Sequence, residues 1–343
     1  MRRTALLLAA VLVAPGAMAH HSRAEYTQTP LEIEGKLTAV LWRNPHPGFT
    51  VETKDDSGRT ITWDVEGWSA LYTFERAGIS RERFKEGDHV RVLGLPSGLR
   101  PGRMLAMNIL LADGTEAVLK RDGDPYFGNA RHLGGRELWE KDTHAAVVDA
   151  KSENRGLFRV WSYPAPAYQT REHVALTDAA QAARAKFDEV ENFIIACGQK
   201  SMPGSMLTPN PYELIDNGAT ITIRGYEGDV VRTVHMSDGA RPPAERERQG
   251  FSVGRWENAR TLVIRTSQIA APHLGFSGVS LDDGAVVEER YVLSEDQTRL
   301  DFTITVTDPK TFTEPATFTE PATFEYYWLA LGETFGRYDC DVH

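Results

Sequence analysis

Three histidines near the start of the chain have the types and spacing that most directly suggest chemistry. His20 and His21 are adjacent, and His46 lies in the segment Asn44-Pro45-His46-Pro47, where the prolines restrict the backbone. If the mature chain begins at His20, its α-amine joins the imidazoles as a compact set of nitrogen ligands. Ligands of this kind bind Cu(II) more tightly than other divalent first-row metals. The pattern predicts a metal site, with copper as the expected ion.

A second interpretation of the same histidines needs no metal. His20 and His21 would then be a solvated chain end, and His46 would serve only the proline-fixed loop. In the metal interpretation, by contrast, Glu25 is close enough in sequence to supply an oxygen ligand or to orient an imidazole ring. Both interpretations stay open, because spacing alone does not bring residue 20 to residue 46.

The first 19 residues decide whether His20 becomes a chain end. Arg2 and Arg3 precede an apolar run of nine residues, 5–13, and the stretch closes on Ala17-Met18-Ala19. This is the plan of a secretory signal peptide, and its small residues predict cleavage after Ala19. A run of that length is too short to span a bilayer. We therefore expect an exported protein, periplasmic or secreted, without a membrane span.

The charge of the chain limits its partners. Removal of Arg2 and Arg3 leaves 36 basic residues against 48 acidic ones, so the mature net charge is −12. A field of that sign argues against nucleic acid and against an anionic membrane surface. The sequence also lacks the G-x-x-x-x-G-K and G-x-G-x-x-G motifs of nucleotide sites. A binding or accessory protein without enzymatic activity is favoured.

The cysteine content fits an oxidising compartment. Cys197 and Cys340 are the only cysteines of the sequence. Such a pair most often forms one disulfide in an exported protein. The bond would close a long loop, for which chain-entropy models give about 4 to 5 kcal/mol as an upper figure. Free thiols or half of a metal site are weaker alternatives, because there is no C-x-x-C motif.

Alternating apolar residues predict a first, small β domain, which would position His46. The predicted elements are strands at 31–42, 49–53, 60–65, 89–95 and 104–111, with a helix at 69–77. Three strands, a helix and two strands are typical of a small OB-type barrel. We expect this barrel over 20–118, with His46 in the loop after its first strand, and an extended linker over 119–170.

The remaining residues predict a second β domain over 171–343. A helix begins near Thr177, which would cap it, and strands with Gly, Asn and Asp turns follow. The predicted strands are 212–215, 220–226, 230–236, 251–256, 261–266, 286–293 and 300–306. Because no helix separates them, an antiparallel barrel or sandwich is expected. The fold class is thus mainly β, with one helix before the second domain.

The second domain suggests an alternative function as a carrier. A β-barrel interior can enclose one small lipophilic ligand. The aromatic residues that would line such a cavity, or else build the core, are Trp256, Tyr291, Phe302 and Tyr326. In this case the first barrel would be an interaction module.

An extracytoplasmic hydrolase is a second alternative, and it has the weakest basis. Residues 250–254 match G-x-S-x-G, which in hydrolases places its serine between a strand and a helix. Here both flanks are predicted as β, so Ser252 is expected to be an ordinary strand residue. Titratable residues that could form an acid/base pair are His235, His273, Glu288, Glu289 and Asp301. Charged residues on strands usually lie on the solvated face, and that is the expectation for these carboxylates.

Several motifs resemble a family of exported proteobacterial proteins whose domain has no known function. In the first half they are HHS, LWRNPH, TWDVEG and GDHVRVLG. The MPGSM loop after Cys197 and the segments VGRWE, EERY and DPKTF look like a partner domain of the same proteins. The resemblance implies a small barrel, a second β domain and no established activity. Phe251 departs from the family pattern, which has a histidine there, and this puts any role of the position in doubt.

Overall fold

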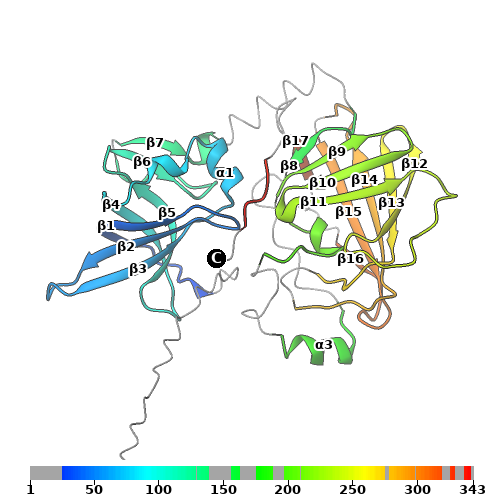
Figure 1. The fold of residues 1–343 in the computed structure, drawn as a ribbon, viewed down its shortest axis with the longest axis horizontal. Helices are drawn as coiled ribbons and strands as arrows, with labels where there is room; N and C mark the ends of the chain where they lie inside the picture. The colour runs from blue at the N-terminus through cyan, green and yellow to red at the C-terminus, as the bar shows by residue number, and fades with distance from the viewer. Residues whose placement is uncertain are drawn as a thin grey trace, which may run out of the picture.

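The computed structural model describes residues 25–128, 130–138, 156–162, 175–187, 197–208, 210–274, 278–297, 299–318, 325–328 and 336–340. Its strands form a seven-stranded and a ten-stranded sheet. Figure 1 shows the two sheets curled into barrels that lie side by side. The predicted mainly β fold, a small barrel followed by a second β barrel, is confirmed. No helix within these ranges has the length and apolar character needed to cross a membrane.

The first barrel forms because apolar residues alternate along its strands, as in β1, where Ile33, Gly35 and Leu37 face inward. Its elements are β1 (Leu31–Leu41), β2 (Gly48–Lys54), β3 (Thr60–Glu66), α1 (Leu71–Arg76), η2 (Arg81–Arg83), β4 (His89–Pro96), β5 (Arg103–Leu110), β6 (Thr115–Val118) and β7 (Arg131–Gly134). β1 pairs with both β2 and β4, and parallel pairing of β3 with β5 closes the ring. This order, with α1 between β3 and β4, is that of an OB-type barrel.

Closure of this ring brings three distant segments to one end of the barrel. Glu66, the last residue of β3, pairs with Gly48 at the start of β2. Asp64, two residues earlier, pairs with Arg103 at the start of β5. The β1–β2 loop, which carries His46, therefore lies beside the carboxyl end of β3.

Short strands lie within 119–170, the range predicted as an extended linker. β7 pairs in parallel with β6 in the first sheet. β8 (Val160–Ser162) pairs with strands of the second sheet. With 4 and 3 residues, these strands are too short for an alternating pattern to be recognised. Their pairing depends on partners that are distant in sequence.

The second barrel contains the seven predicted strands, and each boundary agrees within two residues. Its strands are β8 (Val160–Ser162), β9 (Tyr212–Asp216), β10 (Thr220–Gly225), β11 (Val230–His235), β12 (Phe251–Asn258), β13 (Thr261–Ser267), β14 (Val286–Leu293), β15 (Arg299–Thr307), β16 (Ala316–Phe318) and β17 (Glu325–Trp328). β14 also pairs with β15, so the sheet is nearly closed. At the seam between β8 and β17, two residue pairs join the strands, as is also the case for β8–β9 and β11–β12.

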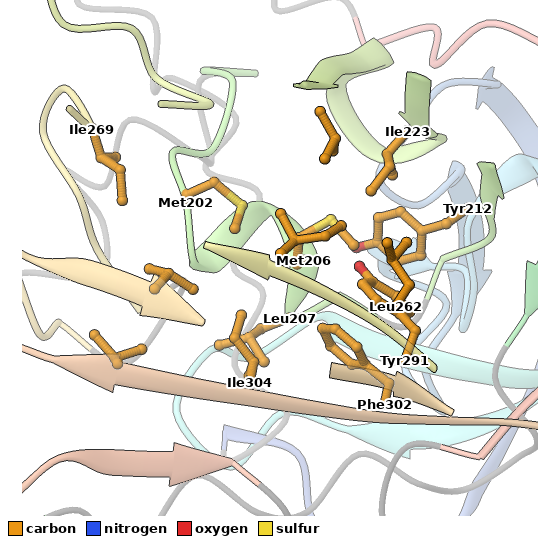
Figure 2. Packing of buried hydrophobic residues seen from close by; sticks show 14 of the residues in the cluster. Met202, Met206, Leu207, Tyr212, Ile223, Leu262, Ile269, Tyr291, Phe302 and Ile304 are labelled. Carbon is orange, nitrogen blue, oxygen red and sulfur yellow. The ribbon is translucent and has the colours of Figure 1, made fainter. Parts of the chain in front are cut away.

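A large cluster of buried side chains lies in the interior of the second barrel. The 3₁₀ helix η3 (Gly204–Met206) and its neighbours bring Met202, Met206 and Leu207 into the core. Figure 2 shows the two methionines in one cluster with Tyr212, Tyr291 and Phe302. The rings of Tyr291 and Phe302 lie 4.8 Å apart. Of the four aromatic residues proposed as core or ligand-lining, Tyr291 and Phe302 are core residues.

Two further predictions on local structure are confirmed. α3 (Asp178–Arg184) begins after Thr177, whose hydroxyl accepts a hydrogen bond from the Ala180 N–H. Cys197 and Cys340 form a disulfide that spans 143 positions of the sequence. The 3₁₀ helix η4 (Glu227–Asp229), between β10 and β11, lies near this carboxyl-terminal end of the chain, because the Tyr338 N–H donates to Asp229 Oδ1.

Candidate metal centre

Of the three predicted metal ligands, His46 lies within the described residues, whereas His20 and His21 lie outside them. The His46 ring is held by a carboxylate at the end of β3. Its Nδ1 is 2.7 Å from Glu66 Oε1, and the two side chains are 21% and 13% exposed. A ring fixed through Nδ1 presents its other nitrogen, Nε2, in a defined direction.

Glu66 is the centre of a polar network that we call the Glu66 cluster: Tyr26, His46, Glu66 and Arg103. The Tyr26 hydroxyl donates to Glu66 Oε2 at 2.7 Å. Arg103 Nη2 donates to the same oxygen at 2.8 Å, and Arg103 Nε donates to the Tyr26 hydroxyl oxygen at 3.1 Å. The cluster therefore connects His46 to Tyr26, near the first described residue of the chain.

The network fixes the charge of Glu66. Burial alone raises the pKa of this carboxyl, but the hydrogen bond and charge of His46, with Tyr26 and Arg103, outweigh it and lower the pKa to about 2. Burial and the charge of Glu66 raise the pKa of the Tyr26 hydroxyl. The carboxylate thus stays ionised and accepts, while the phenol stays protonated and donates.

Glu25, the predicted oxygen ligand or ring-orienting residue, has other partners. Its carboxylate accepts from Arg100 Nε at 2.8 Å and from the Ser97 hydroxyl at 3.0 Å, and it also bonds Arg100 Nη2. The residue that orients the His46 ring is Glu66, which the sequence did not single out. Its position at the Gly48-paired end of β3 was not predictable without the register of β2 and β3, although Glu66 lies in the motif TWDVEG.

No group of three or more His, Cys, Asp or Glu side chains that could hold a metal is found in the part of the chain that the structure describes. Of the predicted ligands, this part contributes His46 with its supporting carboxylate. A metal site here therefore needs ligands from outside the described residues, where the predicted ligands His20 and His21 lie.

The candidate catalytic residues of the second barrel each have a different partner in the structure. Ser252 lies inside β12, fully buried, with its hydroxyl oxygen 2.8 Å from that of Thr266, so it is an ordinary strand residue as predicted. The His235 ring stacks on Phe251 at 5.0 Å. Burial lowers the pKa of His273 to about 4, so this imidazole is neutral at pH 7.

The expectation that the strand carboxylates are solvated is wrong for one of the three. Glu288 is exposed and Asp301 bonds Arg299, but Glu289 is fully buried in the barrel. Arg232 Nη1 and Nη2 donate to Glu289 Oε2 and Oε1 at 2.6 and 3.0 Å, and the Tyr291 hydroxyl donates to Oε1 at 2.8 Å. The buried bidentate pair ties β11 to β14 through the interior.

A hollow of about 410 Å³ lies at the rim of the second barrel, where β11 and β12 separate. We call it the rim hollow. It is lined by Phe158, Asp216, Gly218, Ile221, Met236, Asp238, Gly254, Arg255 and Trp256. Trp256 is 41% exposed, and its ring meets that of Phe158 edge to face at 6.2 Å. The fourth aromatic residue with a predicted role, Tyr326, lies in β17.

Comparison with known proteins gives a family without an assigned activity. A family of unknown function (DUF6152) matches residues 8–104. The matched range includes the three predicted histidine ligands and Glu66, and it ends at the start of β5. No curated protein matches the chain. The chain is thus similar, over its amino-terminal part, to an uncharacterised family.

Proposed function

We propose that the protein is exported, that it is cleaved after Ala19, and that its first barrel binds one divalent metal ion, with Cu(II) preferred. The proposed ligands are the α-amine and imidazole of His20, the imidazole of His21 and Nε2 of His46. The role is that of a periplasmic or secreted binding or accessory protein rather than an enzyme.

The observation that carries the proposal is the 2.7 Å contact between His46 Nδ1 and Glu66 Oε1. Histidines that ligate metals usually donate their other ring N–H to a carboxylate or carbonyl, which fixes the tautomer and raises the basicity of the ligating nitrogen. Glu66 is in turn held by Tyr26 and Arg103. A carboxylate supported on both oxygens keeps the ring in one orientation.

The place where the chain enters the barrel also supports the proposal. Tyr26 and His46 bond the two oxygens of one carboxylate. Residue 21 is five positions before Tyr26, and each position advances an extended chain by at most ~3.3–3.6 Å. His20 and His21 are therefore tethered within reach of His46.

The test compares two forms of the protein that differ only at the amino terminus. One is secreted through its own leader, with the mature terminus confirmed by intact mass, and the other carries an additional Met before His20. We expect about one copper per chain by elemental mass spectrometry in the first form. The second form should keep its circular dichroism spectrum and lose tight Cu(II) binding, because the α-amine is no longer at His20.

Two results would contradict this function. If the first form holds no metal even after Cu(II) is added, the first barrel is not a metal module. If the additional Met leaves Cu(II) affinity unchanged, the α-amine is not a ligand and the proposed ligand set is wrong.

The rim hollow favours a second candidate function, the carrier of a small lipophilic ligand. The described core side chains pack the barrel interior, so the ligand would lie at the rim against Trp256 and Phe158. An exposed tryptophan in a hollow of this size is a typical contact surface for an apolar molecule.

The carrier function predicts binding of an apolar probe at Trp256. The fluorescent dye 1-anilinonaphthalene-8-sulfonate should bind the native protein, and Trp256→Ala should weaken this binding about ten-fold or more. Leu99→Ala is the matched control, because Leu99 is an apolar residue of the first barrel that is 78% exposed. Equal dye binding in native protein and Trp256→Ala, with no organic molecule extractable from the purified protein, would exclude a carrier site at the rim.

A further inference from the structure

Asn44, two residues before His46, joins the two barrels. It is 1% exposed, and its side-chain Oδ1 accepts from the Leu71 N–H at the start of α1. Its Nδ2 donates to the hydroxyl of Tyr226, in the second barrel, at 3.0 Å. A buried amide with partners on both sides fixes the backbone at this point of the β1–β2 loop.

Tyr226 is the centre of an aromatic contact between the barrels. Its ring is 5.4 Å from that of Tyr72 in α1 and 5.4 Å from that of Tyr338 near the carboxyl terminus. Tyr226 is 3% exposed. The buried ring therefore packs against the first barrel on one side and against the carboxyl-terminal segment on the other.

The carboxyl-terminal segment, residues 336–340, completes the contact; it is the dark red ribbon between the barrels in Figure 1. The Asp339 carbonyl accepts from the Asn44 N–H at 2.7 Å. Tyr338 N–H donates to Asp229 Oδ1 at 3.0 Å. One residue further on, Cys340 is bonded to Cys197 of the second barrel. The disulfide thus holds the segment that bonds the backbone of the His46 loop.

We propose that residues 336–340 act as a redox-controlled clamp, in which the Cys197–Cys340 bond and Tyr226 position Asn44 and through it the metal ligand His46. The role of the clamp rests on the proposed metal function. The contacts of Asn44 with Tyr226 and with residues 336–340 do not depend on it. Asn44 and Tyr226 are positioning residues. Their role does not require contact with the ion.

Release of the clamp requires a dithiol reductant. A thiolate of the reductant attacks one sulfur of the Cys197–Cys340 bond and forms a mixed disulfide, and the second thiol of the reductant then displaces the protein cysteine. The reductant becomes a disulfide, and the protein gains two electrons and two protons as two thiols. Both cysteines are partly exposed, so a dithiol can reach them.

The first test measures the loop without metal. Amide hydrogen exchange of peptides that cover 42–48 is compared between oxidised protein and protein reduced with dithiothreitol. We expect exchange in this segment to rise about ten-fold on reduction while β12–β14 stay protected, because the Asn44 N–H loses its acceptor. Unchanged exchange over 42–48 would overturn the clamp, whatever the protein does with metals.

The second test measures the site itself. The variant Cys197→Ser/Cys340→Ser avoids reductants that bind copper, and Asn44→Ala keeps the disulfide but removes the contacts to Tyr226 and Leu71. Both should lower Cu(II) affinity about ten-fold and change the Cu(II) electron paramagnetic resonance spectrum. Asn108→Ala is the matched control: this buried amide bonds Glu116 and Asp124 within the first barrel, and its loss should leave the spectrum unchanged.

The two tests separate the clamp from the metal function. If oxidised native protein binds no Cu(II) but 42–48 loses protection on reduction, the clamp is supported and its role at a metal site is overturned. If Cu(II) binds and neither the serine pair nor Asn44→Ala changes affinity or spectrum, the site does not depend on the second barrel and the clamp is wrong.

Discussion

His46→Ala is expected to abolish tight Cu(II) binding, and Glu66→Gln is expected to weaken it about 10- to 100-fold. The alanine removes a proposed ligand. The glutamine keeps the size of the side chain but removes the charge that holds His46 Nδ1, Tyr26 and Arg103 together. Affinity is measured by competition with a chelator of known Cu(II) affinity, and the fold is checked by circular dichroism.

Glu25→Gln is the matched control for this pair. Glu25 is also a carboxylate of the same end of the barrel, but it bonds Arg100 and Ser97 and lies 3.6 Å from Arg103 Nε, whereas the carboxylate that bonds His46 is Glu66. Its substitution should change Cu(II) affinity less than about three-fold. A loss in Glu25→Gln that equals the loss in Glu66→Gln would show that net charge, rather than orientation of the His46 ring, sets the affinity.

The second large effect is expected on stability. Glu289→Gln should lower the free energy of unfolding by about 3–5 kcal/mol, because it leaves the charge of Arg232 buried without its counter-ion. Both side chains are within 1% of full burial, and among the described residues the Arg232 Nε has no hydrogen-bond partner that would compensate. Urea unfolding followed by far-UV circular dichroism measures the change.

Two further variants identify the cause of the loss. Arg232→Met/Glu289→Leu removes both charges and should recover much of the lost stability, as replacement of buried pairs by apolar residues often does. Glu213→Gln breaks the partly exposed pair with Arg224 and should cost no more than about 1 kcal/mol. If Glu289→Gln costs as little as Glu213→Gln, the buried pair has no special weight in the barrel.

The longer strands of both barrels were predictable because their patterns are local. β14, for example, alternates Val287, Glu289, Tyr291 and Leu293 inward with exposed or half-buried residues between them. The same alternation indicated the buried pair, because Glu289 lies on the inward face of β14 and Arg232 lies on the same face of β11 as Val230 and Val234. The preference of charged residues for solvent was the stronger assumption, and it was wrong for Glu289.

The supporting parts of the site were not predictable, because they depend on pairing between distant segments. Glu66 reaches His46 only when β2 and β3 pair in their register, and Arg103 reaches Glu66 only when β3 and β5 close the ring. The contact of Asn44 with Tyr226 joins positions 182 residues apart. Residue type and local spacing carry no record of such contacts.

The seam of the second barrel has a consequence for synthesis. β8 is made before β9 to β16, yet one of its edges is covered only by β17, and the anchoring Cys340 comes later still. A chain that lacks residues 325–328 leaves one edge of β8 and residues 299–301 of β15 unpaired, with backbone groups that invite pairing with other chains. Residues 325–328 thus protect edges that the earlier strands cannot cover by themselves.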